Sequence, residues 1–178
     1  MLTHGLLDSY LNKNISEICF NGYTNNADNH CAHFVCHVLG LNFGMTCDQL
    51  VSKRQRQYSG ANVRVHEVFA QCLDVMEIQS CPSSIEGLVF ISAPRNFEKN
   101  GKLHPVLRNV SRKHIGLLLN DTVWHYSNIQ DKVIKQAMSE FLFHYRGQLN
   151  ALWYGSLPIG ASPIPWGISI YRPLACLR

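Results

Sequence analysis

Apolar and polar residues follow helix-like spacing in the first quarter of this 178-residue chain. Residues 4–20 place apolar side chains every three to four positions, which predicts one or two short amphipathic helices. From His30 to Leu39 apolar residues recur at i, i+3, i+4 and i+7, and Gly40 follows as a typical C-terminal cap. Residues 21–29, rich in Asn and Asp, predict a loop that feeds the start of this second helix.

Strand patterns dominate the middle of the chain. The apolar run 86–91 predicts a short buried strand, and the polar stretch 93–112 predicts a long loop of the kind that borders a site. Two apolar runs, 115–119 and 122–126, flank Asn120-Asp121, and two turn-forming residues between two such runs predict a β-hairpin.

The remaining elements complete an α+β pattern. Further helices are predicted for about 65–73 and 139–145, and a strand for about 151–154. The length fits one domain. We therefore expect a single domain over 1–178, with its core motifs at about 20–130 and an elaboration at 131–178.

Composition and charge exclude several classes of protein. Apolar residues make up 46% of the chain, and the net charge is only +4 with no long basic run, so no nucleic-acid partner is expected. The chain shows neither a basic leader nor 18 consecutive apolar residues, so we expect no membrane span. It is expected to be soluble, and either cytoplasmic or exported by a specialised secretion route without a signal peptide.

Cysteine usage indicates reduced thiols. Seven cysteines, an odd number, occur without a CxxC pair, which is typical of a cytosol-like compartment rather than a disulfide framework. They are Cys19, Cys31, Cys36, Cys47, Cys72, Cys81 and Cys176.

The hairpin register brings two histidines together. If Asn120 and Asp121 form the turn, Gly116 faces His125, and His114 becomes a diagonal neighbour of His125 on the same face of the sheet. Cys31 completes this set if the start of its helix packs against that face. A thiol in the first turn of a helix, close to an imidazole, is expected to have a lowered pKa and to act as a nucleophile.

The ordered motifs resemble the NlpC-type cell-wall peptidases, a bacterial branch of the papain-like fold. The matching segments are residues 28–35 around Cys31, Glu86-Gly87-Leu88-Val89-Phe90, and His114-Ile115-Gly116-Leu117 followed by Trp124-His125. The run Cys31-Ala32-His33-Phe34-Val35 also resembles the lecithin:retinol acyltransferase relatives, but there the histidines precede the cysteine, so the order favours the NlpC type.

The resemblance implies a papain-like core in which Cys31 is the nucleophile, His114 the general base and His125 the residue that orients it. Tyr23, Asn29 and Asn128 are further candidates for the oxyanion or substrate site, and Asn128 is the alternative orienting residue. The implied reaction is amide hydrolysis through an acyl-thioester, with the stem peptide of peptidoglycan as substrate.

Other classes of function stay open. The same residues suit a papain-like protease, an acyltransferase or a thioesterase acting on a protein or lipid, or they are merely packed in a non-enzymatic binding protein. An inhibitor or immunity protein is a further partner to consider. His33 and His37 have the spacing of a zinc-binding helix, but no Glu lies between them and no third ligand stands out, so no metal or cofactor is expected.

Overall fold

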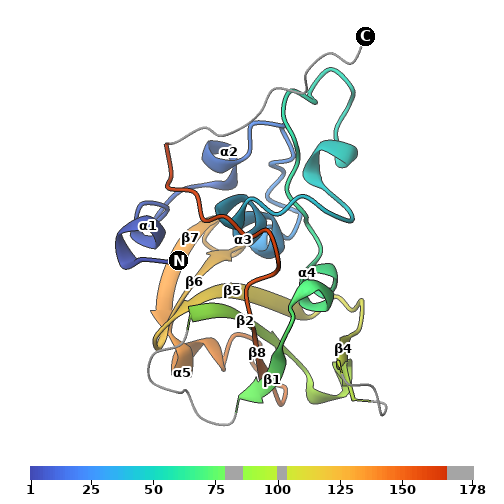
Figure 1. The fold of residues 1–178 in the computed structure, drawn as a ribbon, viewed down its shortest axis with the longest axis vertical. Helices are drawn as coiled ribbons and strands as arrows, with labels where there is room; N and C mark the ends of the chain where they lie inside the picture. Colours follow the sequence, from blue (N-terminus) through green and yellow to red (C-terminus); the bar gives the residue numbers. More distant parts are fainter. Residues whose placement is uncertain (79–85, 100–103, 168–178) are drawn as a thin grey trace.

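A six-stranded antiparallel sheet forms the centre of the protein, seen here in a computed structural model that describes residues 1–78, 86–99 and 104–167 (Figure 1). The strand order is β1-β8-β2-β5-β6-β7. The strands are β1 (Val75–Ile78), β2 (Glu86–Ser92), β5 (Lys113–Leu119), β6 (Thr122–Ser127), β7 (Lys132–Ala137) and β8 (Ala151–Gly155). A separate ladder pairs β3 (Phe97–Glu98) with β4 (Val106–Leu107).

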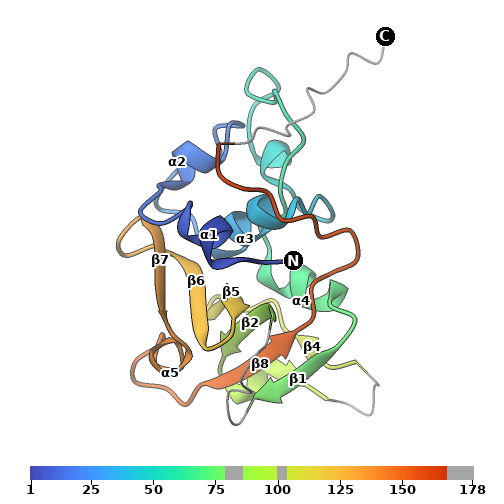
Figure 2. The ribbon, with the colours of Figure 1, turned by 60° about the vertical axis from the view of Figure 1, so that its left-hand side comes forward.

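Helices cover both faces of this sheet (Figures 1 and 2). They are α1 (His4–Asp8), α2 (Ile15–Ile18), α3 (Cys31–Leu39), α4 (Val65–Gln71) and α5 (Met138–Phe141), with short 3₁₀ helices η1 (Cys47–Leu50) and η2 (Pro94–Asn96). Helix α3 packs on β5 and β6 from one side, and α5 contacts β6 and β7 from the other. The fold is therefore α+β with an antiparallel sheet, as the sequence predicts.

The alternation of side chains along the strands divides the interior into two cores. Ile115, Leu117, Trp124 and Tyr126 belong to the larger core, together with α3. Leu118 and Val123 face the other way and pack with Phe141 of α5 in a smaller core. The side of the sheet on which a residue lies thus decides which helix it meets.

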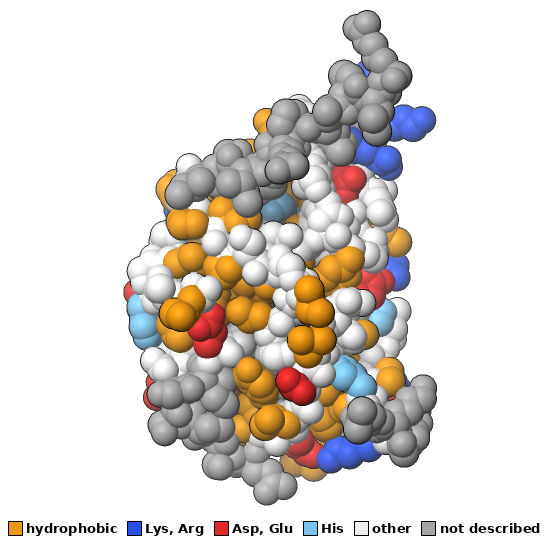
Figure 3. All heavy atoms as spheres, in the orientation of Figure 1, with side chains coloured by type: hydrophobic (Ala, Val, Ile, Leu, Met, Phe, Trp, Pro, Cys, Tyr) orange, Lys and Arg blue, Asp and Glu red, His pale blue; other side chains and the backbone are white. Residues whose placement is uncertain are grey.

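Helix α3 is buried on all sides. All nine of its residues are buried, and it ends at Gly40, whose φ of +64° is the left-handed conformation that glycine adopts without strain. Residues 156–167 cross over its end (Figure 1), where the amides of Ser162 and Ile164 donate to the carbonyls of Leu39 and Val38, both at 2.8 Å. Apolar side chains are spread over the middle of this face of the molecule (Figure 3).

Most predicted elements occur in the structure. The helices within 4–20, 30–39 and 65–73 are confirmed, and so is the hairpin, in which Leu119 pairs with Thr122 around Asn120. The region expected as a C-terminal elaboration instead contributes β7 and β8 to the main sheet, with β8 between β1 and β2.

The described cysteines are all free thiols. Cys19, Cys31, Cys36, Cys47 and Cys72 are buried and form no disulfide, in agreement with the expectation from spacing. Cys81 and Cys176 lie outside the described residues. Within the described ranges, no helix is long and apolar enough to cross a membrane.

Candidate active site

Cys31 is the first residue of α3, and its thiol is buried against the start of β5. The backbone amides of Ile115 and Ala32 favour the thiolate form of Cys31, and the Cys31 amide donates to Asn29 Oδ1 at 3.0 Å. Burial raises the pKa of Cys31 to about 12, and these amides together with Lys113 offset only part of that effect. The expected lowering of the Cys31 pKa is therefore wrong for this resting arrangement, because desolvation outweighs the helix N-terminus.

His114 and His125 do meet as the hairpin register predicts. His114 Nε2 and His125 Nδ1 lie 2.9 Å apart, with the rings edge to face, and His125 Nε2 lies 2.9 Å from Gln136 Oε1 on β7. Direct pairing of β5 with β6 stops at Leu117 and Trp124, so the predicted Gly116–His125 pair is absent from the described ladder. The two rings meet where these strands begin to separate.

This chain of hydrogen bonds, the Gln136–His125–His114 relay, determines which nitrogen of each ring carries the hydrogen. The amide oxygen of Gln136 only accepts, so His125 carries its hydrogen on Nε2 and presents a lone pair at Nδ1. His114 must then donate from Nε2, which leaves His114 Nδ1 unprotonated. Burial holds the pKa of His114 well below its ordinary value, so the ring is neutral near pH 7. In this tautomer, Nδ1 is the ring nitrogen of His114 that can accept a proton.

Helix α3 packs on the predicted sheet but not against the face that carries both histidines, so the condition under which Cys31 would complete that set is not met. Helix α3 packs against Ile115 and Leu117, the bulky apolar neighbours of His114, whereas the His114 ring lies against Phe141 on the α5 side. An apolar helix buries more surface against that apolar face than against two imidazoles. No hydrogen bond joins the Cys31 thiol to His114 among the residues that the structure describes.

The two groups nevertheless lie at the same end of β5. The Ile115 amide, which favours the Cys31 thiolate, belongs to the residue directly after His114. Because the β5–β6 ladder ends at Leu117, backbone pairing between these strands does not close the sheet at this point. A Cys31–His114 dyad would therefore require the His114 ring to move toward the thiol when substrate binds.

His144, for which no role is predicted from the sequence, extends the cluster formed by His114 and His125. Its ring stacks on that of His114 with 4.0 Å between centroids and 21° between planes, and burial lowers the pKa of His144 to about 4. The three histidines have ligand atoms within 4.8 Å of one another. Stacked rings direct their lone pairs along nearly parallel lines rather than toward one point, so this cluster suits proton relay better than metal binding.

The other predicted candidates lie around the start of α3. Asn29 caps the Cys31 amide, and Asn128 Oδ1 accepts from the His30 amide at 3.1 Å, so His125, not Asn128, is the partner of His114. The Tyr23 ring packs against His30 and His33, with centroids 5.4 and 5.3 Å away. Tyr23 therefore belongs to the surroundings of His33 rather than to the Cys31 thiol.

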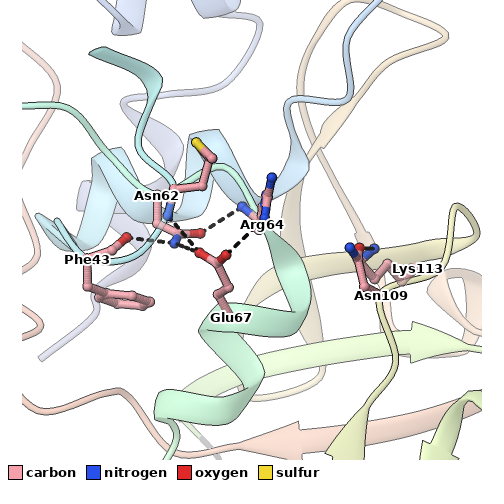
Figure 4. Close-up of polar contacts among 7 residues, drawn as sticks. Phe43, Asn62, Arg64, Glu67, Asn109 and Lys113 are labelled. Atoms are coloured by element: carbon pink, nitrogen blue, oxygen red, sulfur yellow. Dashed lines mark hydrogen bonds and ion pairs between the residues drawn. The ribbon is translucent and has the colours of Figure 1, made fainter. Parts of the chain in front are cut away.

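A cavity of about 290 Å³ opens beside the thiol. Its lining includes Cys31, Arg64, Asn109 and Lys113. Arg64 stands at the start of α4, and Lys113 donates to Asn109 Oδ1 at 3.0 Å (Figure 4). No role is predicted for these cavity residues from the sequence, where the basic pair Arg112-Lys113 directly before His114 is the one pattern that indicates a charged site.

The position of Arg64 is fixed by a small polar network. Glu67 accepts from the Met45 amide at 2.9 Å and from Asn62 Nδ2 at 2.6 Å, and its second oxygen lies 3.4 Å from Arg64 Nη1 (Figure 4). With Lys113, this network places two positive charges at the cavity that Cys31 lines.

Comparison with known proteins adds no relative. The chain matches no protein-family model. It also matches no curated protein and no solved structure.

Proposed function

We propose that this protein is a cysteine hydrolase that cleaves an amide bond through an acyl-thioester, with Cys31 as nucleophile, His114 as general base and His125 as the residue that positions the base. One observation carries the proposal: His114, His125 and Gln136 form a chain of 2.9 Å contacts at the end of β5 whose Ile115 amide favours the Cys31 thiolate.

The chemistry follows from the protonation states. The Cys31 thiol is protonated at rest, so His114 Nδ1 takes the proton as the sulfur attacks the substrate carbonyl. The new carbon–sulfur bond forms a tetrahedral intermediate, and the imidazolium returns the proton to the leaving amine. Water then cleaves the thioester with the same base. The relay stabilises the imidazolium, because His125 Nδ1 accepts from its Nε2–H.

The cavity favours a substrate that carries a carboxylate near the scissile bond. Arg64 offers a planar donor pair for a carboxylate, and Lys113 supplies a positive charge close to the oxygen that becomes negative during attack. A peptidoglycan stem peptide has such carboxylates, and the NlpC-type papain-like resemblance points to the same substrate. An acyl conjugate of a protein or lipid would react with the same thiol but would not require the positive charges of both Arg64 and Lys113.

The test is hydrolysis of a panel of stem-peptide muropeptides, followed by mass spectrometry, for the wild-type chain and for Cys31→Ser. We expect cleavage by the wild type and at least about a 10³-fold loss in the variant, since the thiol forms the covalent intermediate. Cys72→Ser is the matched control, because Cys72 is another buried thiol and lies outside the cavity. Cleavage of acyl thioesters but not of muropeptides would mean that the substrate is an acyl conjugate. If the folded protein cleaves neither kind of substrate, the result would favour a non-enzymatic binding protein.

A further inference from the structure

A second group of chemically active side chains lies on α3, apart from the relay. Cys19, His33, His37 and Cys47 are all buried, and one ligand atom from each lies within 4.8 Å of the others. The four come from separate parts of the chain. Cys19 directly follows α2, the two histidines lie one turn apart on α3, and Cys47 begins η1.

The distances fit one tetrahedral ion. Zinc–sulfur bonds of about 2.3 Å and zinc–nitrogen bonds of about 2.0 Å give tetrahedral edges of about 3.8 Å between sulfurs, about 3.3 Å between nitrogens and about 3.5 Å between sulfur and nitrogen. The structure has 3.8 Å between the Cys19 and Cys47 sulfurs, 3.0 Å between the Nε2 atoms of His33 and His37, and 4.0 Å from Cys47 Sγ to His37 Nε2. These three of the six edges agree to within about 0.5 Å.

A second layer of hydrogen bonds prepares His33 as a ligand. His30 Nε2 lies 2.8 Å from the Asn25 carbonyl, which only accepts, so His30 presents a lone pair at Nδ1. His30 Nδ1 lies 3.1 Å from His33 Nδ1, so His33 Nδ1 must carry the hydrogen of this bond. His33 Nε2 is then free to coordinate. A carbonyl or ring that fixes the far nitrogen is typical of metal-bound histidine.

Hydrogen-bond donors surround the Cys47 sulfur and favour a negative charge on it. Cys47 Sγ accepts from the Ala61 amide at 3.3 Å and lies 3.8 Å from Asn21 Nδ2. Donors of this kind stabilise thiolates, and two buried thiolates require a compensating charge.

We propose that Cys19, His33, His37 and Cys47 bind one zinc ion in a closed, structural site. Two cysteines lose their protons and two neutral histidines add lone pairs, so the divalent ion balances the two thiolates and two protons are released to solvent. The ligand set is Cys₂His₂, for which zinc is the preferred metal, and four buried protein ligands leave no position for substrate. The ion ties α2 and η1 to the helix that carries Cys31.

A disulfide between Cys19 and Cys47 explains the cluster less well. The sulfurs lie 3.8 Å apart, far beyond a bonded distance of about 2.05 Å, and a disulfide would leave the facing nitrogens of His33 and His37 without a role. From the sequence no metal is expected at these two histidines, because their spacing fits a zinc-binding helix but no third ligand stands out. The fold provides two.

The first experiment measures metal in the chain purified without a histidine tag. We expect one zinc per chain by plasma mass spectrometry. Replacement by Co²⁺ should give the intense visible bands of a tetrahedral site with thiolate charge transfer. A wild-type chain that holds no zinc and, after reconstitution, gives no tetrahedral Co²⁺ spectrum would overturn the proposal, whatever the variants do.

Variants then assign the ligands. Cys47→Ser should weaken Co²⁺ binding at least about 10-fold and remove part of the charge-transfer band, whereas Cys72→Ser should leave both unchanged. An unchanged spectrum in folded Cys47→Ser would contradict the site. Should Cys47→Ser not fold, His37→Cys replaces that test, since it keeps four ligands and should increase the charge-transfer intensity. Cys31→Ala separates the two proposals, because it should abolish hydrolysis and retain zinc.

Discussion

Removing the acceptor at His125 tests the relay most directly. In His125→Leu the Nε2–H of His114 loses its partner at 2.9 Å and stays buried, which costs about 1 to 3 kcal/mol of the free energy of unfolding. The same hydrogen bond favours the Nε2–H tautomer, so its loss changes the tautomer ratio by about 5- to 150-fold. With the ring also freed to reorient, turnover should fall about 10²- to 10⁴-fold.

Two measurements check this prediction independently. Long-range ¹H–¹⁵N correlation spectra assign the hydrogen of His114 to Nε2 in the wild type and should show Nδ1–H in His125→Leu, while urea unfolding measures the loss of stability. His125→Gln is the matched control, because its amide oxygen accepts from His114 and should restore the wild-type tautomer. A wild-type His114 with its hydrogen on Nδ1 would refute the reasoning, even if the protein is active.

Three further outcomes follow from burial and backbone geometry. Because the pKa of the Cys31 thiol is about 12, iodoacetamide at pH 7 should alkylate it no faster than an ordinary cysteine, and rapid labelling in a mass-spectrometric time course would contradict that state. His114 and His125 both have lowered pKa values, so the unfolded chain binds protons that the folded chain does not. The free energy of unfolding, measured in urea, should therefore fall as the pH drops below about 6.5, with a slope that approaches about 1.4 kcal/mol per pH unit for each histidine until its folded-state pKa is reached. A flat profile would contradict this. Gly40→Ala should cost about 1 kcal/mol in thermal unfolding because φ is +64°, whereas Gly5→Ala, inside α1 with open space around it, should not destabilise.

Local patterns were sufficient to predict the elements that carry the candidate site. Helix α3 appears in the sequence as an apolar repeat ending at Gly40, and the His114–His125 contact follows from the two turn residues Asn120 and Asp121. Both depend on contacts between residues close in sequence. Strand β7, by contrast, has one buried residue, Val133, among intermediate and exposed positions rich in lysine and glutamine, so its sequence gives only a weak strand signal.

Long-range packing could not be predicted in this way. The sequence does not specify which face of the hairpin receives α3, and the apolar face carrying Ile115 receives it rather than the face carrying His114. Nor does spacing indicate that Cys19 and Cys47 reach the α3 histidines, since one follows a helix and the other begins a 3₁₀ turn. Both outcomes depend on how loops close around a buried helix.

The insertion of β8 between β1 and β2 has a consequence for biosynthesis. Until residues 151–155 leave the ribosome, β2 has β5 as a neighbour on one side and an unpaired edge on the other, although its side chains are almost all buried in the finished fold. Exposed apolar edges of this kind recruit other chains. The nascent protein therefore depends on chaperone protection or rapid completion late in translation, and truncation before residue 151 should yield aggregates rather than a smaller domain.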